Sequence, residues 1–377
     1  MNTKRISSLG TGFSLMMVLL VVVSIAQGQS GRTRPTPTPT PGDDESVKII
    51  TEEVKLNVVA LDDNGKFFPG VGVNDLVITD NDILHQPSSV RRVPANVLIV
   101  MDTGGEMRVA KSLDQTKRTA KALIERLRDD DQIAVMQYSD KPEILTEWTS
   151  NKNIALSAVN SAKFGRRSML LDALRFATAF LRKSSPDNKH LILITDGTDS
   201  AGRNLEVEAA FRSILSTDIS VHVISYTKLE LNDITPRAKG ISKTPPPPAM
   251  PPEVAATLPN GVRDQAQSAK IGTVINVDRK YLRIMQQRKK DLENAEKSLQ
   301  KIADDTGGEM LNPETAEEMI ERTAIIAGMI DSSYVVTYTP KISVAESKNV
   351  RSISVTSKRE GLVVLANRRL IAGNSSN

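Results

Sequence analysis

The chain of 377 residues contains no cysteine, so disulfide bridges, zinc–thiolate sites and thiol nucleophiles are excluded. Histidine is scarce as well, and its three copies are His85, His190 and His222. Two of them, His190 and His222, lie in predicted strands, which favours structural roles over catalysis or metal binding. Aromatic residues make up only 3% of the chain, too few for a surface on which the bases of single-stranded nucleic acid would stack.

A strong excess of positive charge is also missing. The formal net charge is +4, and it falls to +2 if Lys4 and Arg5 are removed with the amino-terminal segment described next. Nucleic-acid-binding domains carry a pronounced basic patch or stripe. The charge balance therefore predicts no nucleic-acid partner.

Long apolar runs are absent except near the amino terminus. There, a basic pair precedes the apolar run 13–26, and small residues stand at a suitable cleavage position before Gln29. This pattern predicts a secretory signal peptide over residues 1–28. The alternative is an uncleaved anchor, although the run is short for a membrane span, and it would be the protein's one contact with a membrane. In both cases we expect the rest of the chain to be extracytoplasmic: secreted, periplasmic or at the cell surface.

Residues 29–46 form a linker that is rich in proline and threonine and includes the string TRPTPTPTP. Alternating Pro and Thr favour an extended polyproline II conformation and supply no core. We interpret the segment as a tether between the export signal and the folded part.

Alternating apolar and polar residues, which are typical of half-buried strands, flank the centre of the chain. Residues 47–95 contain about three strand candidates, and residues 331–371 contain about three more. Three strands are marginal for an independent sheet. We therefore expect the two ends to pair into one small β-sandwich-like domain.

The centre of the chain, residues 96–330, alternates predicted strands and helices. The strings ANVLIVMD and KHLILITDG lack a polar alternation, as in strands that are buried on both faces, and helical spacing appears between them. This pattern predicts an α/β fold with a mostly parallel, doubly wound sheet and helices on both of its faces. In such sheets ligands bind at the carboxyl ends of the strands.

Residues 228–278 interrupt this rhythm with a proline-rich, loop-like insertion that is longer than an ordinary connection. We expect the insertion to be disordered or to cover the carboxyl edge of the sheet. A charged helix is predicted after it, over residues 279–305. Its Lys, Arg and Glu at i, i+4 spacing are typical of a solvated helix, and binding of a partner is the alternative.

Three oxygen-bearing side chains come together at the carboxyl edge of the predicted sheet. Asp102 ends one buried strand, Asp196 ends another, and Ser168 stands where a helix begins. Two carboxylates and a hydroxyl suit a hard cation such as Mg²⁺, Ca²⁺ or Mn²⁺. Each residue also has an ordinary structural interpretation, because Asp102 and Ser168 can cap helices and Asp196 can form a turn.

In this order the three residues resemble the metal-ion-dependent adhesion site of von Willebrand factor A (VWA) domains. That site combines a D-x-S-x-S loop, a Thr before an x-L-x-D-A helix and the Asp of a T-D-G strand end. Asp102 matches the first Asp, Ser168 takes the place of the Thr in SMLLDAL, and Asp196 matches the Asp of T-D-G. The resemblance covers about residues 96–329. With its strand-rich flanks, the chain is similar to the secreted bacterial, acidobacterial-type VWFA-related group, which implies a Rossmann-like core.

The first loop departs from the family pattern. D-T-S-G-S-M would be expected, but the chain reads D-T-G-G-E-M, with Gly104 and Glu106 in place of the two serines. The resemblance still implies a degenerate site for Mg²⁺, or for Ca²⁺ or Mn²⁺, with the ligands Asp102, Glu106, Ser168 and Asp196. The alternative is that the metal has been lost and that Arg166 or Arg167 neutralises the clustered carboxylates. We name Gly104, Arg166 and Arg167 as candidate partner-binding residues.

These observations predict an exported, non-catalytic binding protein whose VWA-like domain mediates protein–protein interaction or adhesion with an unknown protein ligand. An enzyme is not expected, because the sequence offers neither a candidate His or Cys nor a serine in a G-x-S-x-G elbow. One alternative is a structural component of the cell envelope without a metal site. The other is a metal-dependent hydrolase that uses the acidic cluster.

The hexapeptide DTGGEM occurs twice, at residues 102–107 and 305–310. The second copy follows a predicted helix, so Gly307 or Gly308 suits a left-handed C-cap, and a short strand is expected to start after it. The flanking residues do not repeat. We therefore interpret the identity of the two strings as a coincidence.

Overall fold

The computed structural model describes residues 52–105, 111–183, 187–242, 274–275, 277–344 and 350–371. The predicted signal peptide 1–28, the linker 29–46, Glu106 and most of the insertion 228–278 lie outside the described residues. None of the helices in the described part combines the length and the apolar character that a membrane-spanning helix needs.

The centre of the fold is a six-stranded sheet with the strand order β12-β9-β8-β5-β6-β7. Its strands are β5 (Asn96–Asp102), β6 (Gln132–Tyr138), β7 (Pro142–Thr149), β8 (Lys189–Thr195), β9 (Ser220–Ser225) and β12 (Met310–Leu311). All neighbours are parallel except β7, which runs antiparallel to β6. Every residue of β5 and β9 is buried, as expected for strands that are covered on both faces. The predicted mostly parallel α/β sheet is therefore confirmed.

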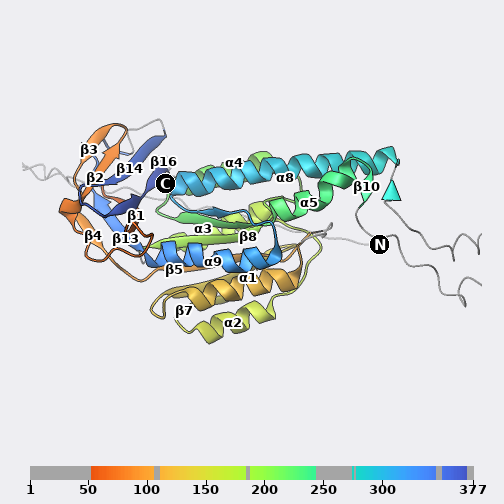
Figure 1. The fold of residues 1–377 in the computed structure, drawn as a ribbon, viewed down its shortest axis with the longest axis horizontal. Helices are drawn as coiled ribbons and strands as arrows, with labels where there is room; N and C mark the ends of the chain where they lie inside the picture. Colours follow the sequence, from red (N-terminus) through yellow and green to blue (C-terminus); the bar gives the residue numbers. More distant parts are fainter. Residues whose placement is uncertain are drawn as a thin grey trace, which may run out of the picture. The chain divides into compact units, whose positions relative to one another are not determined.

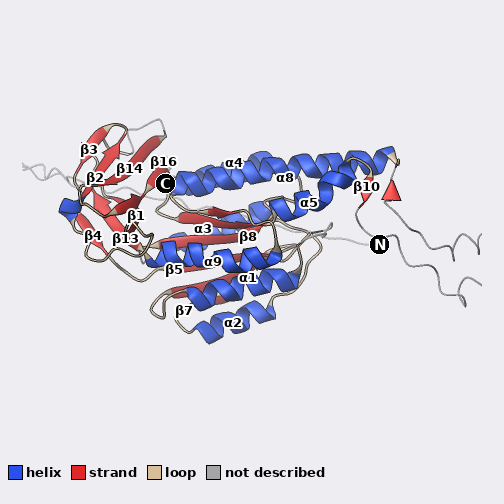
Figure 2. Cartoon of the chain, viewed as in Figure 1, coloured by secondary structure: helices blue, strands red, loops and turns tan. Residues whose placement is uncertain are grey.

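Helices cover both faces of this sheet (Figures 1 and 2). One face packs against α1 (Leu113–Arg126), α2 (Lys152–Ser161) and α9 (Ala316–Asp331). The other packs against α3 (Leu170–Lys183), α4 (Asn204–Ile214) and α8 (Arg279–Thr306). Along β5, Leu98 and Val100 face the second core while Ile99 and Met101 face the first, which is the period of two that a strand imposes.

The strands at the two ends of the described chain form two further four-stranded sheets. The first has the order β15-β1-β13-β4, with β15 (Val363–Leu365), β1 (Val54–Leu61), β13 (Ser333–Tyr338) and β4 (Ser89–Arg91). The second has the order β16-β14-β2-β3, with β16 (Asn367–Leu370), β14 (Arg351–Ser357), β2 (Leu76–Asp80) and β3 (Ile83–His85), and the short 3₁₀ helix η1 (Val73–Asp75) precedes β2. Because β1 pairs with β13 and β2 with β14, amino- and carboxyl-terminal strands share one core, as predicted.

Part of the predicted loop-like insertion is a helix, so that prediction is wrong for residues 228–238. Helix α5 (Thr227–Ala238) follows β9 directly, and β10 (Ile241–Ser242) pairs with β11 (Val274–Ile275). The segment is helical because Ile234 and Ala238 pack on Met285 and Leu292 of α8, a contact that sequence periodicity did not reveal. Its Pro236 lies in the last turn and cannot donate a backbone hydrogen bond, and only two helical residues follow it.

The second DTGGEM string ends helix α8. Gly307 has φ +69° and ψ +27° and is the left-handed C-cap that the sequence predicted. Gly308 lies so close to β9 that an added Cβ would be 1.9 Å from the carbonyl oxygen of Val221. Met310 then opens the short strand β12, so this string connects a helix to a strand.

Candidate functional site

Parallel neighbouring strands bring the predicted residues Asp102, Ser168 and Asp196 to the same carboxyl edge of the sheet. Asp102 ends β5, Asp196 follows the adjacent β8, and Ser168 precedes α3. All three side chains are buried. The hydroxyl of Ser168 donates to Oδ2 of Asp102 at 2.9 Å and so holds the carboxylate in place.

A lysine that the sequence did not single out lies between the two carboxylates. Nζ of Lys111 is 2.6 Å from Oδ2 of Asp102 and 3.3 Å from Oδ2 of Asp196. Only 3% of the Lys111 side chain is exposed. Its backbone N–H donates to Oε1 of Glu230 on α5 at 2.8 Å, and this bond anchors the backbone from which the lysine side chain extends.

A second cation reaches the edge from α8. Nη2 of Arg288 lies 3.0 Å from Oδ2 of Asp196, and Nη1 donates to the hydroxyl of Thr198 at 2.8 Å. The long helix that follows the insertion is therefore tied to the end of β8. Because Lys111 and Arg288 together carry two positive charges, they balance the two carboxylates.

The remaining oxygen atoms of both carboxylates also have donors. Oδ1 of Asp102 accepts the backbone N–H of Gly104 at 3.0 Å, and Thr195 donates more weakly to Oδ2 at 3.4 Å. Oδ1 of Asp196 accepts both the N–H and the hydroxyl of Thr198 at 2.9 and 2.7 Å. These last bonds form the turn that the sequence suggested as the ordinary role of Asp196.

The ionisation of the cluster follows from burial and from these contacts. Burial by itself would lower the pKa of Lys111, but Asp102 and Asp196 together raise it above its ordinary value. Burial acts to raise the pKa of Asp196, yet the nearby Lys111 and Arg288 hold it well below the usual range. Asp102 lacks the second cation, and burial raises its pKa. The lysine therefore stays charged, and Asp196 is the firmer anion of the pair.

The loop after Asp102 leaves no room for the serine that the family pattern has at position 104. An ideal Cβ on Gly104 would lie 1.6 Å from the carbonyl oxygen of Arg167 and 2.9 Å from the Cα of Ser139. Backbone atoms cannot yield as a flexible side chain can. Glu106, the other predicted ligand of this loop, lies outside the described residues.

Arg166 and Arg167, which were named as the alternative means of neutralising the carboxylates, do not lie between them. Arg166 and Arg167 are both exposed, and the backbone N–H of Arg166 donates to Asp140 at 3.3 Å. The ammonium of Lys111 occupies the place we assigned to one of these guanidinium groups. Sequence reasoning missed Lys111 and Arg288 because the first stands in a connecting segment and the second 92 residues beyond Asp196. The one feature of the sequence that could have pointed to these cations is the pair of clustered carboxylates, which needs a positive charge nearby.

A polar pocket of about 270 Å³ opens over this cluster, and Gly105, Lys111, Ser168, Ser200 and Arg288 contribute to its lining. Ser200 is part of the frame, since its hydroxyl accepts the backbone N–H of Ser168 at 2.7 Å. Within the described ranges, no three Asp, Glu, His or Cys side chains are grouped as a metal site would require.

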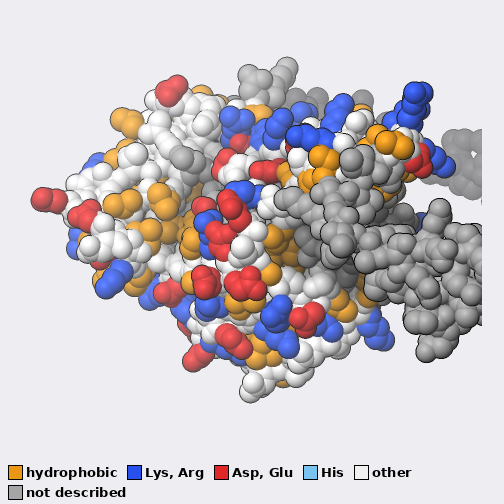
Figure 3. All heavy atoms as spheres, turned by 45° about the vertical axis from the view of Figure 1, so that its right-hand side comes forward, with side chains coloured by type: hydrophobic (Ala, Val, Ile, Leu, Met, Phe, Trp, Pro, Cys, Tyr) orange, Lys and Arg blue, Asp and Glu red, His pale blue; other side chains and the backbone are white. Residues whose placement is uncertain are grey.

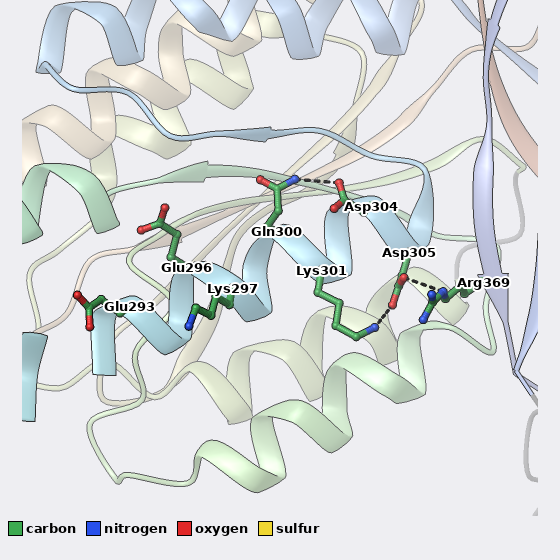
Figure 4. A pocket seen from close by; sticks show the side chains of 8 residues that line it. All are labelled: Glu293, Glu296, Lys297, Gln300, Lys301, Asp304, Asp305 and Arg369. Carbon is green, nitrogen blue, oxygen red and sulfur yellow. Dashed lines mark hydrogen bonds and ion pairs between the residues drawn. The ribbon is translucent and has the colours of Figure 1, made fainter. Parts of the chain in front are cut away.

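A larger hollow of about 820 Å³ lies along α8 (Figure 4), and it shares no lining residue with the pocket at the sheet edge. Most of its lining residues are charged, and some of them pair: Asp305 contacts Lys301, and Oδ1 of Asp305 lies 3.2 Å from Nε of Arg369. Figure 3 likewise shows acidic and basic side chains interspersed over the described part of one face. We regard the hollow as a solvated ionic surface, and the smaller pocket at the sheet edge as the site.

Residues 96–247 match the family model of the von Willebrand factor type A domain. An uncharacterized protein of Synechocystis sp. is 29% identical over 117 residues, which are 30% of this chain and 28% of that protein. Inter-alpha-trypsin inhibitor heavy chain H4 of Bos taurus is 23% identical over 154 residues, 37% of this chain and 17% of that protein. The matches thus span less than a third of either relative. A solved von Willebrand factor type A structure from Catenulispora acidiphila has 11% identity and a TM-score of 0.41, over 85% of this chain and 73% of that one.

Proposed function

We propose that this chain, in which residues 96–247 form a von Willebrand factor type A domain, is an exported, non-catalytic protein that binds another protein. The binding surface is the carboxyl edge of the central sheet around Asp102, and the finer form of the proposal is adhesion through that edge. Export is supported by the signal-like sequence of residues 1–28.

The observation that carries the proposal is that hydrogen bonds and an ion pair join separate segments at this edge, which bears exposed side chains suited to an interface. Ser168 and Lys111 tie separate segments to Asp102, and the N–H of Gly165 donates to the carbonyl of Thr103 at 3.2 Å. The same segment exposes Arg166 and Arg167 beside Phe164, which is 53% exposed. Arginine and aromatic side chains on a preorganised surface are typical of interface hot spots.

The absence of enzymatic activity is supported by the groups at this edge. The buried His190 and His222 hydrogen-bond to one another inside β8 and β9 and offer no imidazole to the pocket. The hydroxyl of Ser168 donates to Asp102 Oδ2, and that oxygen already accepts the ammonium of Lys111. A serine without an available base is a poor nucleophile.

Affinity capture with charge-reversed variants tests the proposal. The full chain is immobilised and exposed to extracts of its native cell envelope, and captured proteins are compared between the wild type and R166E/R167E. We expect one or more proteins to be lost from the variant, with affinity reduced roughly tenfold or more. The matched control is K66E/K358E, which reverses two exposed lysines of the β-sandwich unit. Equal capture of partner proteins by the wild type, R166E/R167E and K66E/K358E would contradict the proposed binding edge.

A further inference from the structure

The charge pattern of the carboxyl edge is that of a cation site whose cation belongs to the chain itself. Lys111 Nζ contacts Oδ2 of Asp102 and Oδ2 of Asp196, which are the two carboxylates that the family pattern assigns to the metal site. The lysine and both aspartates are almost completely excluded from solvent. A buried ammonium that is paired with two carboxylates is costly to remove, because Asp102 would then keep an uncompensated charge while Asp196 would retain only Arg288.

The described residues of this edge, which do not include Glu106, do not fit a divalent ion. A metal between Asp102 and Asp196 would need their Oδ2 atoms, and these accept Lys111, Ser168 and Arg288. The positive charges of Lys111 and Arg288 would also repel such a metal ion. The loop offers no substitute ligand at position 104, because a side chain there would meet the backbone of Arg167.

We infer that the ammonium of Lys111 is the resident cation of this VWA edge, so that the edge keeps its structure and its binding function without a divalent metal. Together with Arg288 the lysine neutralises Asp102 and Asp196, and it links the ends of β5 and β8 as a bound ion would. The statement on binding rests on the proposed function. The statement on the resident cation is independent of any partner.

The ligand chemistry of the edge changes as a result. A coordinated divalent ion can accept a carboxylate from a partner into its coordination shell, whereas the charge of Lys111 is already shared by two aspartates and is buried. A partner must therefore be recognised by the exposed rim, where Arg166 and Arg167 supply the guanidinium groups and Phe164 an apolar surface. This combination suits an acidic protein segment that carries an apolar side chain.

Thermal unfolding of the full chain with and without Mg²⁺, Mn²⁺ or Ca²⁺ tests the inference, and titration calorimetry accompanies it. For the wild type we expect no saturable heat and no change in Tm. K111A removes the ammonium and opens space between the carboxylates, so its Tm falls in the absence of metal. Saturating Mn²⁺ should then raise the Tm of K111A by roughly 5 °C.

Two further variants keep the test decisive. K189A is the control, because Lys189 is also mostly buried and its Nζ lies 3.3 Å from Oδ1 of Asp218, at the opposite end of β8. The K189A protein should gain no affinity for Mn²⁺. If K111A alone fails to fold, D102N/K111M, which removes one charge of each sign, should restore folding and remain indifferent to Mn²⁺.

Saturable binding of a divalent ion by the wild type would overturn the inference, and so would a K111A protein that is destabilised but gains no affinity for Mn²⁺. Loss of partner capture in EDTA by a wild type that binds no metal would instead contradict only the claim about binding. Failure to capture any protein under all conditions would contradict the proposed function but not the inference that Lys111 is the resident cation.

Discussion

A side chain on Gly104 would collide with the backbone of Arg167, because an ideal Cβ there lies 1.6 Å from the Arg167 carbonyl oxygen. The glycine that replaces the family's serine is thus required by the close approach of two loops. We predict that G104A lowers the free energy of unfolding by about 3 kcal/mol, the upper range for overpacked sites. Urea denaturation measures the change.

The matched control is G328A. Gly328 lies inside α9, and a Cβ there meets no atom within 4 Å, so alanine should leave stability unchanged or raise it by up to about 1 kcal/mol. If G104A were as stable as G328A, the loop would have a different conformation from the one described. For the same steric reason, G104S should not create a metal-binding site.

Arg288 connects α8 to the site through Asp196 and Thr198. R288A should lower the free energy of unfolding by about 2 kcal/mol, the usual scale for hydrogen bonds to a charged group. Hydrogen exchange of the amides after β8 should accelerate, since Thr198 and Asp196 lose a common anchor. R283A, an exposed position of the same helix, is the control and should change neither quantity. Identical effects of the two variants would show that Arg288 does not hold the edge.

The buried pair His190 and His222 predicts how stability depends on pH. Glu309 N–H donates to Nδ1 of His222 at 3.2 Å, so neutral His222 carries its proton on Nε2, which faces Nδ1 of His190 at 3.1 Å. His190 then donates from Nε2 to Asn188 at 2.8 Å. Both rings therefore fit the network only in their neutral forms.

Burial lowers the pKa of His222 to about 4 and that of His190 well below its ordinary value, with a further contribution from His222 to the latter. The unfolded chain therefore binds more protons than the native one between about pH 6.5 and pH 4. The contribution of the neutral pair to the free energy of unfolding should be fully present above pH 6.5. It should be lost progressively as the pH drops through this window. Per histidine the slope reaches about 1.4 kcal/mol per pH unit.

Urea denaturation at pH 7.5, 6, 5 and 4.5 gives this slope, and H222Q should flatten it. His85 on β3 is a control, because H85Q leaves the buried pair intact. A wild-type free energy of unfolding that stays constant from pH 7.5 to 4.5 would contradict the neutral pair.

Much of the architecture follows from local patterns. The runs of Val, Ile and Leu in β5 and β8 predicted buried parallel strands, and the polar residue that ends each run predicted an edge where Asp102 and Asp196 meet. Ser168 lies at the same edge, since it precedes α3 and its hydroxyl donates to Asp102. The C-cap at Gly307 followed from the Gly pair alone.

The sequence could not reveal contacts that depend on tertiary packing. Helix α5 has weak helical periodicity and forms against α8, so its residues read as a loop. Lys111 and Arg288 reach the carboxylates from a connection and from a distant helix, while Arg166 stands next to Ser168 in sequence and yet is exposed. Proximity along the chain was therefore a poor guide to which cation is buried.

The most direct test of the resident lysine is a crystal structure of the full chain grown with Mn²⁺, with anomalous data collected for manganese. We predict no anomalous peak between Asp102 and Asp196, and an ammonium of Lys111 within hydrogen-bond distance of both carboxylates. A manganese peak between the two aspartates, with the Lys111 side chain displaced, would contradict the account.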